Sequence, residues 1–300
     1  MTSLVRSAPR VLGSLGEVGP ISYGQWRYTT DDLDAAQQLI ETALDAGMNL
    51  IDTADVYGLD WGGDGFGEVE ALLGKVLTRT PALRDRMLLA TKGGIRPPTP
   101  YDSSPEWLTT ACHDSLRRLA VDTIDLYQIH RFDTYTHPAD VAAVLTTLRD
   151  EGKIREVGVS NHTVAQTVAL QAHLPFPLVT AQPEYSALTL DPMRDGTFDH
   201  CAAVGLVPLA WSPLAGGKLA TGDDVTSELL AVLDRLAERE GVERSHIAVA
   251  FVLAHPAAPI PIIGTQKASR IVDTCRALDV TLDRNDVYAI VQASDGVPLP

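Results

Sequence analysis

Four side chains that can bind or release protons lie at the ends of short apolar stretches. Asp52, Lys92 and His130 each end such a stretch, and Tyr57 follows Asp52 just before a glycine-rich segment. A buried lysine is costly unless it is paired, so we expect Lys92 to pair with Asp52. The ammonium group would lower the pKa of the Tyr57 phenol from about 10 and make it a general acid. His130 would donate a hydrogen bond to a substrate oxygen.

Each of these residues alone has a structural interpretation: a buried ion pair, a surface tyrosine, or a histidine whose hydrogen bonds are all satisfied. The case for a site is that all four fall at the ends of consecutive strands. In a parallel barrel those ends meet on one face. The sequence therefore predicts a catalytic set of Asp52, Tyr57, Lys92 and His130.

Strand and helix patterns alternate along the whole chain. This alternation predicts an α/β fold, a (β/α)8 TIM barrel in a single domain over 1–300, with extra helices late in the chain. Residues 1–20 precede the first barrel strand, and 295–300 form a C-terminal tail. The expected strands are 21–26, 48–52, 87–92, 124–130, 156–160, 178–182, 206–211 and 260–263, with helices between them, two late ones at 228–240 and 245–255, and a last one from 269.

Composition narrows the class of protein. The 300 residues are 45% hydrophobic and 21% charged, which is typical of a globular chain with a large core. The net charge of −15 argues against nucleic-acid and membrane partners, because both carry dense negative charge. The three cysteines are widely spaced, and no metal-ligand pattern occurs, so we expect reduced thiols, no metal and a cytoplasmic location. The sequence carries no signal for the oligomeric state.

Several motifs resemble those of the aldo-keto reductase family, in order and in context. They span 24–273 and comprise Asp52-Thr53-Ala54-Asp55-Val56-Tyr57, Ala90-Thr91-Lys92-Gly93, Asp125-Leu126-Tyr127-Gln128-Ile129-His130, Gly158-Val159-Ser160-Asn161 and Trp211-Ser212-Pro213-Leu214-Ala215-Gly216-Gly217. The resemblance implies NADPH-dependent reduction of an aldehyde or ketone, with Tyr57 as the general acid. It also implies a metal-free enzyme without a Rossmann fold, in agreement with the lack of a GxGxxG motif here.

The same resemblance implies a set of cofactor contacts. Ser160, Asn161 and Gln182 would hold the nicotinamide carboxamide, and the Trp211 ring would stack on the nicotinamide. The other implied contacts of NADP(H) are Gly24, Gln25, Ser212, Leu214, Gly216, Lys218, Gly264, Thr265, Gln266, Lys267, Arg270 and Asp273.

Two glycine-containing segments would meet the cofactor's phosphates. Residues 214–219 offer backbone amides and the cation of Lys218, a weak signal because a glycine pair more often forms a plain turn. Lys267 and Arg270 suit the 2′-phosphate of NADP. Well-known family members have lysine and serine at Gly264-Thr265 and Glu-Asn at Asp273-Thr274. The preference for NADP over NAD is therefore a prediction.

Trp26, Trp61 and Phe132 are candidates for the wall of the substrate pocket, because they follow strand ends or lie in the adjoining loops. They suggest an apolar or aromatic carbonyl compound as the small-molecule substrate. Two other functions stay open. One is a non-enzymatic NADP(H)-binding redox-sensing subunit, and the other is a barrel hydrolase or isomerase of another superfamily, for which the expected metal or phosphate motifs are missing.

Overall fold

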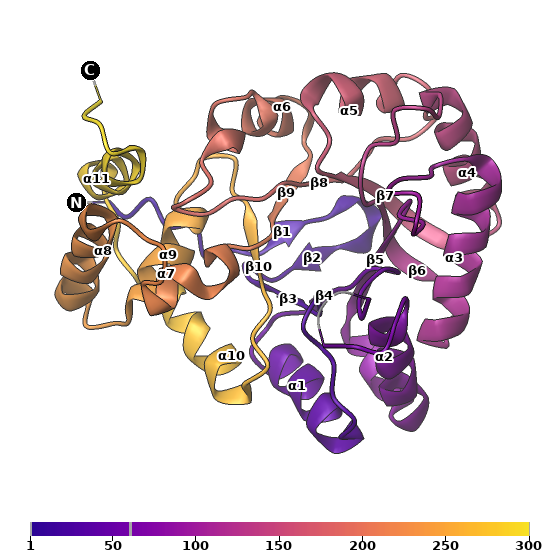
Figure 1. Cartoon of the computed structure of the whole chain (residues 1–300), viewed down its shortest axis with the longest axis horizontal. Helices are drawn as coiled ribbons and strands as arrows, with labels where there is room; N and C mark the ends of the chain where they lie inside the picture. Colours follow the sequence, from indigo (N-terminus) through magenta and orange to yellow (C-terminus); the bar gives the residue numbers. More distant parts are fainter. Residues whose placement is uncertain (1, 60–61, 300) are drawn as a thin grey trace.

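Eight parallel strands close into a barrel in the computed structural model, which describes residues 2–59 and 62–299. Strand neighbours follow the chain order, and the last strand closes on the first. Figure 1 looks onto the carboxyl ends of these strands, with the helices arranged around them. The strands are β3 Ser22–Gly24, β4 Leu50–Asp52, β5 Leu88–Gly93, β6 Ile124–Ile129, β7 Ile154–Ser160, β8 Thr180–Gln182, β9 Val207–Ala210 and β10 Ile260–Ile263. The predicted (β/α)8 barrel is confirmed.

The helices begin where the sequence offers capping groups. Asp32 accepts hydrogen bonds from the first amides of α1, and Ser104 caps α3 with Pro105 in the first helical position. The helices are α1 Leu33–Asp45, α2 Glu68–Arg79, α3 Pro105–Leu119, α4 Pro138–Asp150, α5 Val164–Gln171, α6 Thr197–Val204, α7 Lys218–Thr221, α8 Ser227–Glu240, α9 Arg244–Leu253, α10 Ala268–Thr274 and α11 Arg284–Asp295. Among the described residues, no helix combines the length and apolar character needed to cross a membrane.

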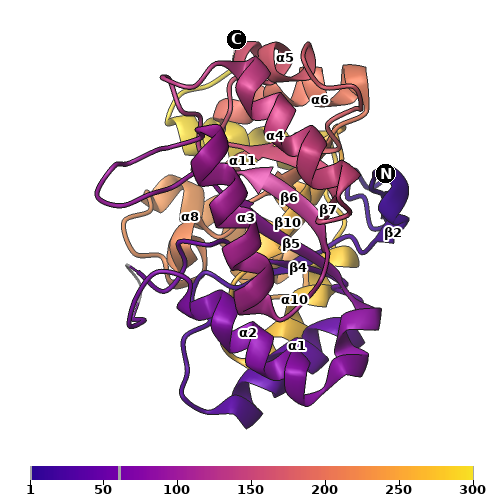
Figure 2. The same cartoon turned by 90° about the vertical axis from the view of Figure 1, so that its right-hand side faces the viewer.

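A hairpin that the sequence did not suggest lies beneath the barrel. Strands β1 Arg10–Val11 and β2 Glu17–Val18 pair antiparallel, and Leu12 and Val18 are fully buried. Both side chains pack into an aliphatic cluster inside the barrel with residues such as Leu50, Leu126 and Ile260. Figure 2 shows this N-terminal part on the side of the barrel opposite the long loop after β5. The hairpin and the cluster fill one end of the barrel, which leaves the carboxyl ends of the strands open for a site.

The element boundaries differ from prediction mainly in the second half of the chain. A single helix was expected between the strands at 178–182 and 206–211, but a short 3-10 turn at Asp191–Met193 precedes α6. The break falls at Gly196, which has a left-handed backbone (φ 87°) that most residues avoid. The short helix α7 and the separate C-terminal helix α11 were not predicted.

Candidate active site

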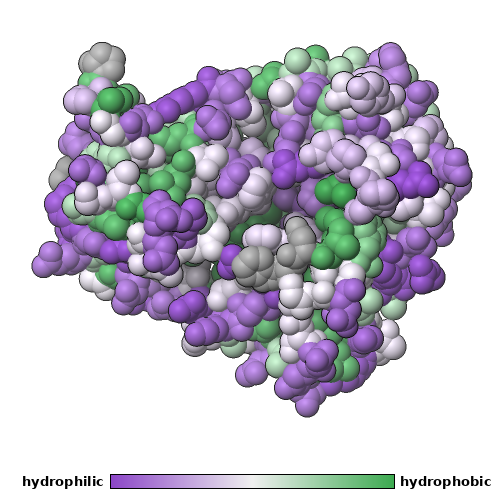
Figure 3. Space-filling view, in the orientation of Figure 1, coloured by the Kyte–Doolittle hydropathy of each residue, from purple (hydrophilic) through white to green (hydrophobic). Residues whose placement is uncertain are grey.

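Strand register brings the predicted catalytic residues to one end of the barrel. Asp52 lies opposite Gly24 on one side and Ala90 on the other, and Lys92 lies opposite Gln128. Alternate residues of a strand share a face, so Gln128 and His130 point the same way. Figure 3 shows this face of the molecule hollowed near its middle, with apolar side chains deep in the hollow.

The centre of the site is a buried ion pair. Lys92 Nζ lies 2.6 Å from Asp52 Oδ2, and both residues are almost completely buried. The ammonium group also donates to the Thr53 carbonyl oxygen at 2.8 Å and to Tyr57 Oη at 3.5 Å. Burial alone would lower the pKa of Lys92, but Asp52 and Tyr57 outweigh it and raise the pKa. Lys92 is therefore a cation with its three donors directed to three oxygens.

The phenol of Tyr57 stays protonated in this environment. Burial raises its pKa above the ordinary value near 10, and Lys92 opposes that shift only in part. The prediction that Lys92 lowers the pKa is correct for that one interaction and wrong for the net shift, because desolvation of the phenolate is the larger effect. Tyr57 therefore keeps its proton and can act as an acid.

His130 is a neutral imidazole beside the phenol. Burial, followed by the charges of Lys92 and Arg131, holds its pKa well below the usual range. Its ring packs edge-on to Tyr57, with the ring centres 5.9 Å apart. The buried Nδ1 atom has no hydrogen-bond partner among the described residues. A neutral histidine can offer one N–H to a ligand atom.

Asp52 is held by more than the lysine. Gln182 Nε2 donates to Asp52 Oδ1 at 2.9 Å, and Gln128 Nε2 does so at 3.3 Å. Gln128 was not predicted as a site residue, although a polar residue two positions before His130 in an apolar run was a usable signal. These amides keep the carboxylate oriented toward Lys92.

The residues predicted to hold a carboxamide form one hydrogen-bonded group at the ends of β7, β8 and β9. Asn161 Nδ2 donates to Ser160 Oγ at 2.8 Å, and Ser160 Oγ donates to the Gln182 carbonyl oxygen at 2.9 Å. Trp211 Nε1 donates to Asn161 Oδ1 at 3.0 Å. The indole ring is therefore fixed beside amide and hydroxyl groups.

The side-chain amide of Gln25 indicates whether a polar ligand fits at the carboxyl end of the barrel. Gln25 follows β3, is fully buried, and neither its amide nitrogen nor its amide oxygen has a partner among the described residues. Buried amides are normally paired, so this group suits a polar ligand at the barrel end. A nicotinamide nucleotide carries suitable donors and acceptors.

The loop after β9 has an unusual backbone conformation, and the amides of Ala215, Gly216 and Gly217 donate within the loop itself. Ser212, Gly216 and Gly217 all have positive φ angles, of 55°, 70° and 108°. Ser212 Oγ accepts from the Gly216 amide at 2.9 Å, and Arg27 donates to the Gly216 carbonyl oxygen at 2.9 Å. Leu214 directly precedes the short 3-10 turn Ala215–Gly217 of this loop. Lys218 forms an exposed ion pair with Asp224 at 3.1 Å, which contributes little and leaves the cation able to exchange partners.

The segment after β10 carries two exposed cations. Lys267 and Arg270 have side chains in solvent with no ion pair to another described residue. Gln266 Nε2 donates to Tyr23 Oη at 3.4 Å, and the Tyr23 hydroxyl donates to the Thr265 carbonyl oxygen at 3.2 Å. At the predicted contact Gly264, a Cβ atom would lie 3.6 Å from the Gly24 carbonyl oxygen, an ordinary van der Waals contact.

Asp273 is held by a neighbouring helix. Its Oδ2 atom lies 3.1 Å from Nε2 of the buried His246 in α9. His246 Nδ1 accepts from the Glu243 amide, so Nε2 carries the proton that Asp273 accepts. The Asp273 carboxylate therefore has a fixed orientation.

The predicted substrate wall is only partly assembled. Trp26 is 38% exposed, and the Arg27 guanidinium lies 5.3 Å from its ring centre. Phe132 packs edge-on against His162, with the ring centres 5.5 Å apart, and the two line a small cavity of about 20 Å³. Trp61 lies outside the described residues. Two charged residues near the site were not predicted from the sequence: Arg131, whose charge acts on Tyr57, and Glu184, whose carboxyl group is acted on by Arg131.

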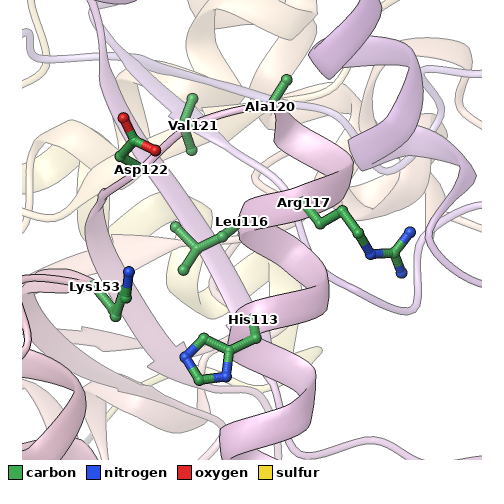
Figure 4. A pocket seen from close by; sticks show the side chains of 7 residues that line it. All are labelled: His113, Leu116, Arg117, Ala120, Val121, Asp122 and Lys153. Carbon is green, nitrogen blue, oxygen red and sulfur yellow. The ribbon is translucent and has the colours of Figure 1, made fainter.

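A larger hollow of about 380 Å³ lies elsewhere, at the amino ends of β6 and β7. Figure 4 shows His113, Lys153 and Asp122 around Leu116, with Arg117 pointing away from them. Arg117 pairs with Asp114 at 3.0 Å. Asp52, Tyr57, Lys92 and His130 lie at the carboxyl ends of the strands, so this hollow is separate from the candidate site.

Among the described residues, no group of three metal-ligating side chains is close enough to hold a metal ion.

The fold and the site define a barrel oxidoreductase. The chain belongs to the Aldo/keto reductase family, whose model matches residues 20–295. Enzymes of this family reduce carbonyl groups and use nicotinamide cofactors.

Two relatives of known activity are similar along nearly their whole length. A 6-dehydroglucose reductase from Novosphingobium aromaticivorans is 49% identical over 97% of each chain. A second 6-dehydroglucose reductase, from Agrobacterium fabrum, is 34% identical over 93% of this chain and 95% of its own.

Two solved structures show the same fold. The glycerol dehydrogenase AKR11B4 from Gluconobacter oxydans superposes with a TM-score of 0.83 at 28% identity, over 98% of this chain and 97% of its own. The thermostable aldo-keto reductase Tm1743 superposes with a TM-score of 0.81 at 23% identity, over 95% of this chain and 99% of its own.

Proposed function

We propose that the protein catalyses the NADPH-dependent reduction of an aldehyde or ketone to an alcohol, with Tyr57 as the general acid. The observation that carries the proposal is the Lys92 ammonium group, which joins Asp52 and Tyr57 in one buried hydrogen-bonded set. When bound, NADPH supplies the hydride that reduces the carbonyl carbon. Tyr57 Oη gives its proton to the carbonyl oxygen of the substrate, and the Lys92 ammonium group stabilises the phenolate that remains. His130 donates a hydrogen bond to the carbonyl oxygen of the substrate.

Residues at the ends of neighbouring strands would hold the nicotinamide. Ser160, Asn161 and Gln182 would bind its carboxamide, and the Trp211 ring, fixed by Asn161, would support its face. Gly24 ends β3, and the buried amide of Gln25, which has no partner among the described residues, follows it; both would contact the cofactor. The loop with Ser212, Leu214, Gly216 and Lys218 would meet the pyrophosphate, and Gly264 to Asp273 would meet the adenosine end.

The names of the relatives suggest a more specific substrate. Because two relatives are 6-dehydroglucose reductases, we propose that 6-dehydroglucose or a similar sugar carbonyl is reduced here. The test is NADPH consumption at 340 nm by the purified protein with 6-dehydroglucose, with butanal, and with no carbonyl compound. Consumption only when a carbonyl is present supports the reductase. Cofactor binding without carbonyl-dependent consumption would instead favour a redox-sensing subunit.

Removing the two cations after β10 should weaken NADPH binding selectively. Hydrogen bonds to charged groups contribute about 1.5–3 kcal/mol, so we expect Lys267→Ala or Arg270→Ala to raise the NADPH Kd about tenfold. The NADH Kd should not change, because NADH lacks the 2′-phosphate. Calorimetric titration of each variant with both cofactors measures the two constants. Equal catalytic efficiency with NADH and NADPH in the unmodified protein would contradict this assignment.

The pH dependence follows from the raised pKa of Tyr57. Reduction uses the protonated phenol, which persists above pH 9, so kcat for reduction should stay flat from about pH 7 to 9. Alcohol oxidation needs the phenolate, so its rate should rise about tenfold per pH unit over the same range. The lowered pKa of His130 means that no inflection should occur near pH 6.5. A reduction rate that falls steadily between pH 7 and 9 would show that Tyr57 ionises in that range.

A further inference from the structure

Arg131 is a cation at the site whose charge no neighbour neutralises. It follows His130, and its guanidinium carbon lies 5.9 Å from the centre of the Trp211 ring. It makes no hydrogen bond or ion pair with any other residue in the part of the chain that the structure describes. Its charge lowers the pKa of both Tyr57 and His130, so the field of Arg131 reaches the reacting groups.

The other groups of the site leave this charge uncompensated. Lys92 is paired with Asp52 at 2.6 Å, which makes that pair neutral overall. Tyr57 keeps its proton, and His130 is uncharged. The excess charge among these groups is therefore the one positive charge of Arg131.

Glu184 is the acid that responds most directly to Arg131. It is partly buried and bridges to Trp211 through the backbone. Burial raises its pKa, the charge of Arg131 lowers it, and a smaller contribution from Asp191 raises it further. The two side chains do not approach within the 4.0 Å of an ion pair. Glu184 thus reduces the positive field without cancelling it.

We infer that Arg131 sets the relative affinity of the site for the two redox forms of its nicotinamide cofactor. The inference rests on the proposed function, in which the nicotinamide binds against Trp211. The oxidised ring carries a positive charge and the reduced ring is neutral, so a fixed cation nearby repels only the oxidised ring. Arg131 makes the protein prefer NADPH over NADP⁺, and released NADP⁺ competes only weakly for the site.

Calorimetric titration of the full chain with NADPH and NADP⁺ at pH 8 tests this inference. In Arg131→Met, the ratio of the NADP⁺ Kd to the NADPH Kd should fall roughly tenfold, through tighter binding of NADP⁺, because one like-charge repulsion in a medium of low dielectric is removed. Arg131→Lys keeps the charge and should keep the ratio close to that of the unmodified protein. Glu184→Gln removes a negative charge and should raise the ratio.

A matched control removes the same charge far from the site. Arg117→Met, at the other end of the barrel, should leave the ratio unchanged. A charge effect should change the ratio of the two Kd values in opposite directions in Arg131→Met and Glu184→Gln. Local damage to the site would change the ratio in the same direction in both variants. An unchanged ratio in Arg131→Met, or equal weakening of both cofactor forms, would overturn this inference alone. Failure of the unmodified protein to bind either form would overturn the proposed function and this inference with it.

Discussion

Replacing Tyr57 by phenylalanine should lower kcat for carbonyl reduction by about 10²–10⁴-fold, which is the usual contribution of a positioned general acid. The variant keeps the aromatic ring that packs against His130 and loses only the hydroxyl that lies 3.5 Å from Lys92 Nζ. Cofactor binding should therefore stay within about twofold of the unmodified protein, because no proposed cofactor contact is removed. Steady-state kinetics and calorimetric NADPH titration measure the two effects separately.

Tyr135→Phe is the matched control for that experiment. Tyr135 is 98% exposed, and its backbone amide is fixed by Asp133. The same loss of a phenolic hydroxyl should leave kcat unchanged there. If Tyr57→Phe retained more than a tenth of the activity, another group would have to supply the proton.

Replacing Asp52 by alanine should cost about 3–5 kcal/mol of stability, because it leaves the Lys92 ammonium group buried without its carboxylate. Lys92 is fully buried, so water cannot take the place of the lost partner. The unfolding temperature should fall on the order of 10 °C in a chain of this size. Activity should also fall steeply, since Lys92 would lose the contact that directs it toward Tyr57.

A second substitution distinguishes the charge from the packing at this position. The double variant Asp52→Asn with Lys92→Met has neither ion, so it should be more stable than Asp52→Ala while remaining inactive. Thermal unfolding of the two variants and of the unmodified protein provides the comparison. Equal unfolding temperatures for Asp52→Ala and the unmodified protein would mean that Lys92 does not depend on the carboxylate.

The barrel could be predicted because apolar strands and capped helices alternate clearly along the chain. Helices α1 and α3 begin directly after Asp32 and Ser104, which are residue types that favour helix starts. The hairpin at Arg10–Val11 and Glu17–Val18 could not be found in this way, since each of its strands has two residues and no pattern repeats. Helix α11 was missed because much of its surface is polar and its start depends on a capping box between Asp283 and Asp286.

The grouping of Asp52, Tyr57, Lys92 and His130 was predictable because three of them end consecutive strands. The net pKa shift of Tyr57 was not, because the cost of burying a phenolate depends on packing that the sequence does not give. Arg131 was missed for a related reason. An arginine after a strand is usually solvated, and only the structure shows that this one lies over Trp211 without an ionic partner in 2–59 or 62–299.

The register of β5 has a consequence for how this chain can change in length. Lys92 faces Asp52 because it lies two positions after Ala90, the residue opposite Asp52. Deleting one residue within β5 would turn the ammonium group to the outside of the barrel, since neighbouring residues of a strand face opposite ways. Insertions and deletions that evolution retains should therefore lie in the loops after β5 and β9, while the strands that carry the site keep a constant length.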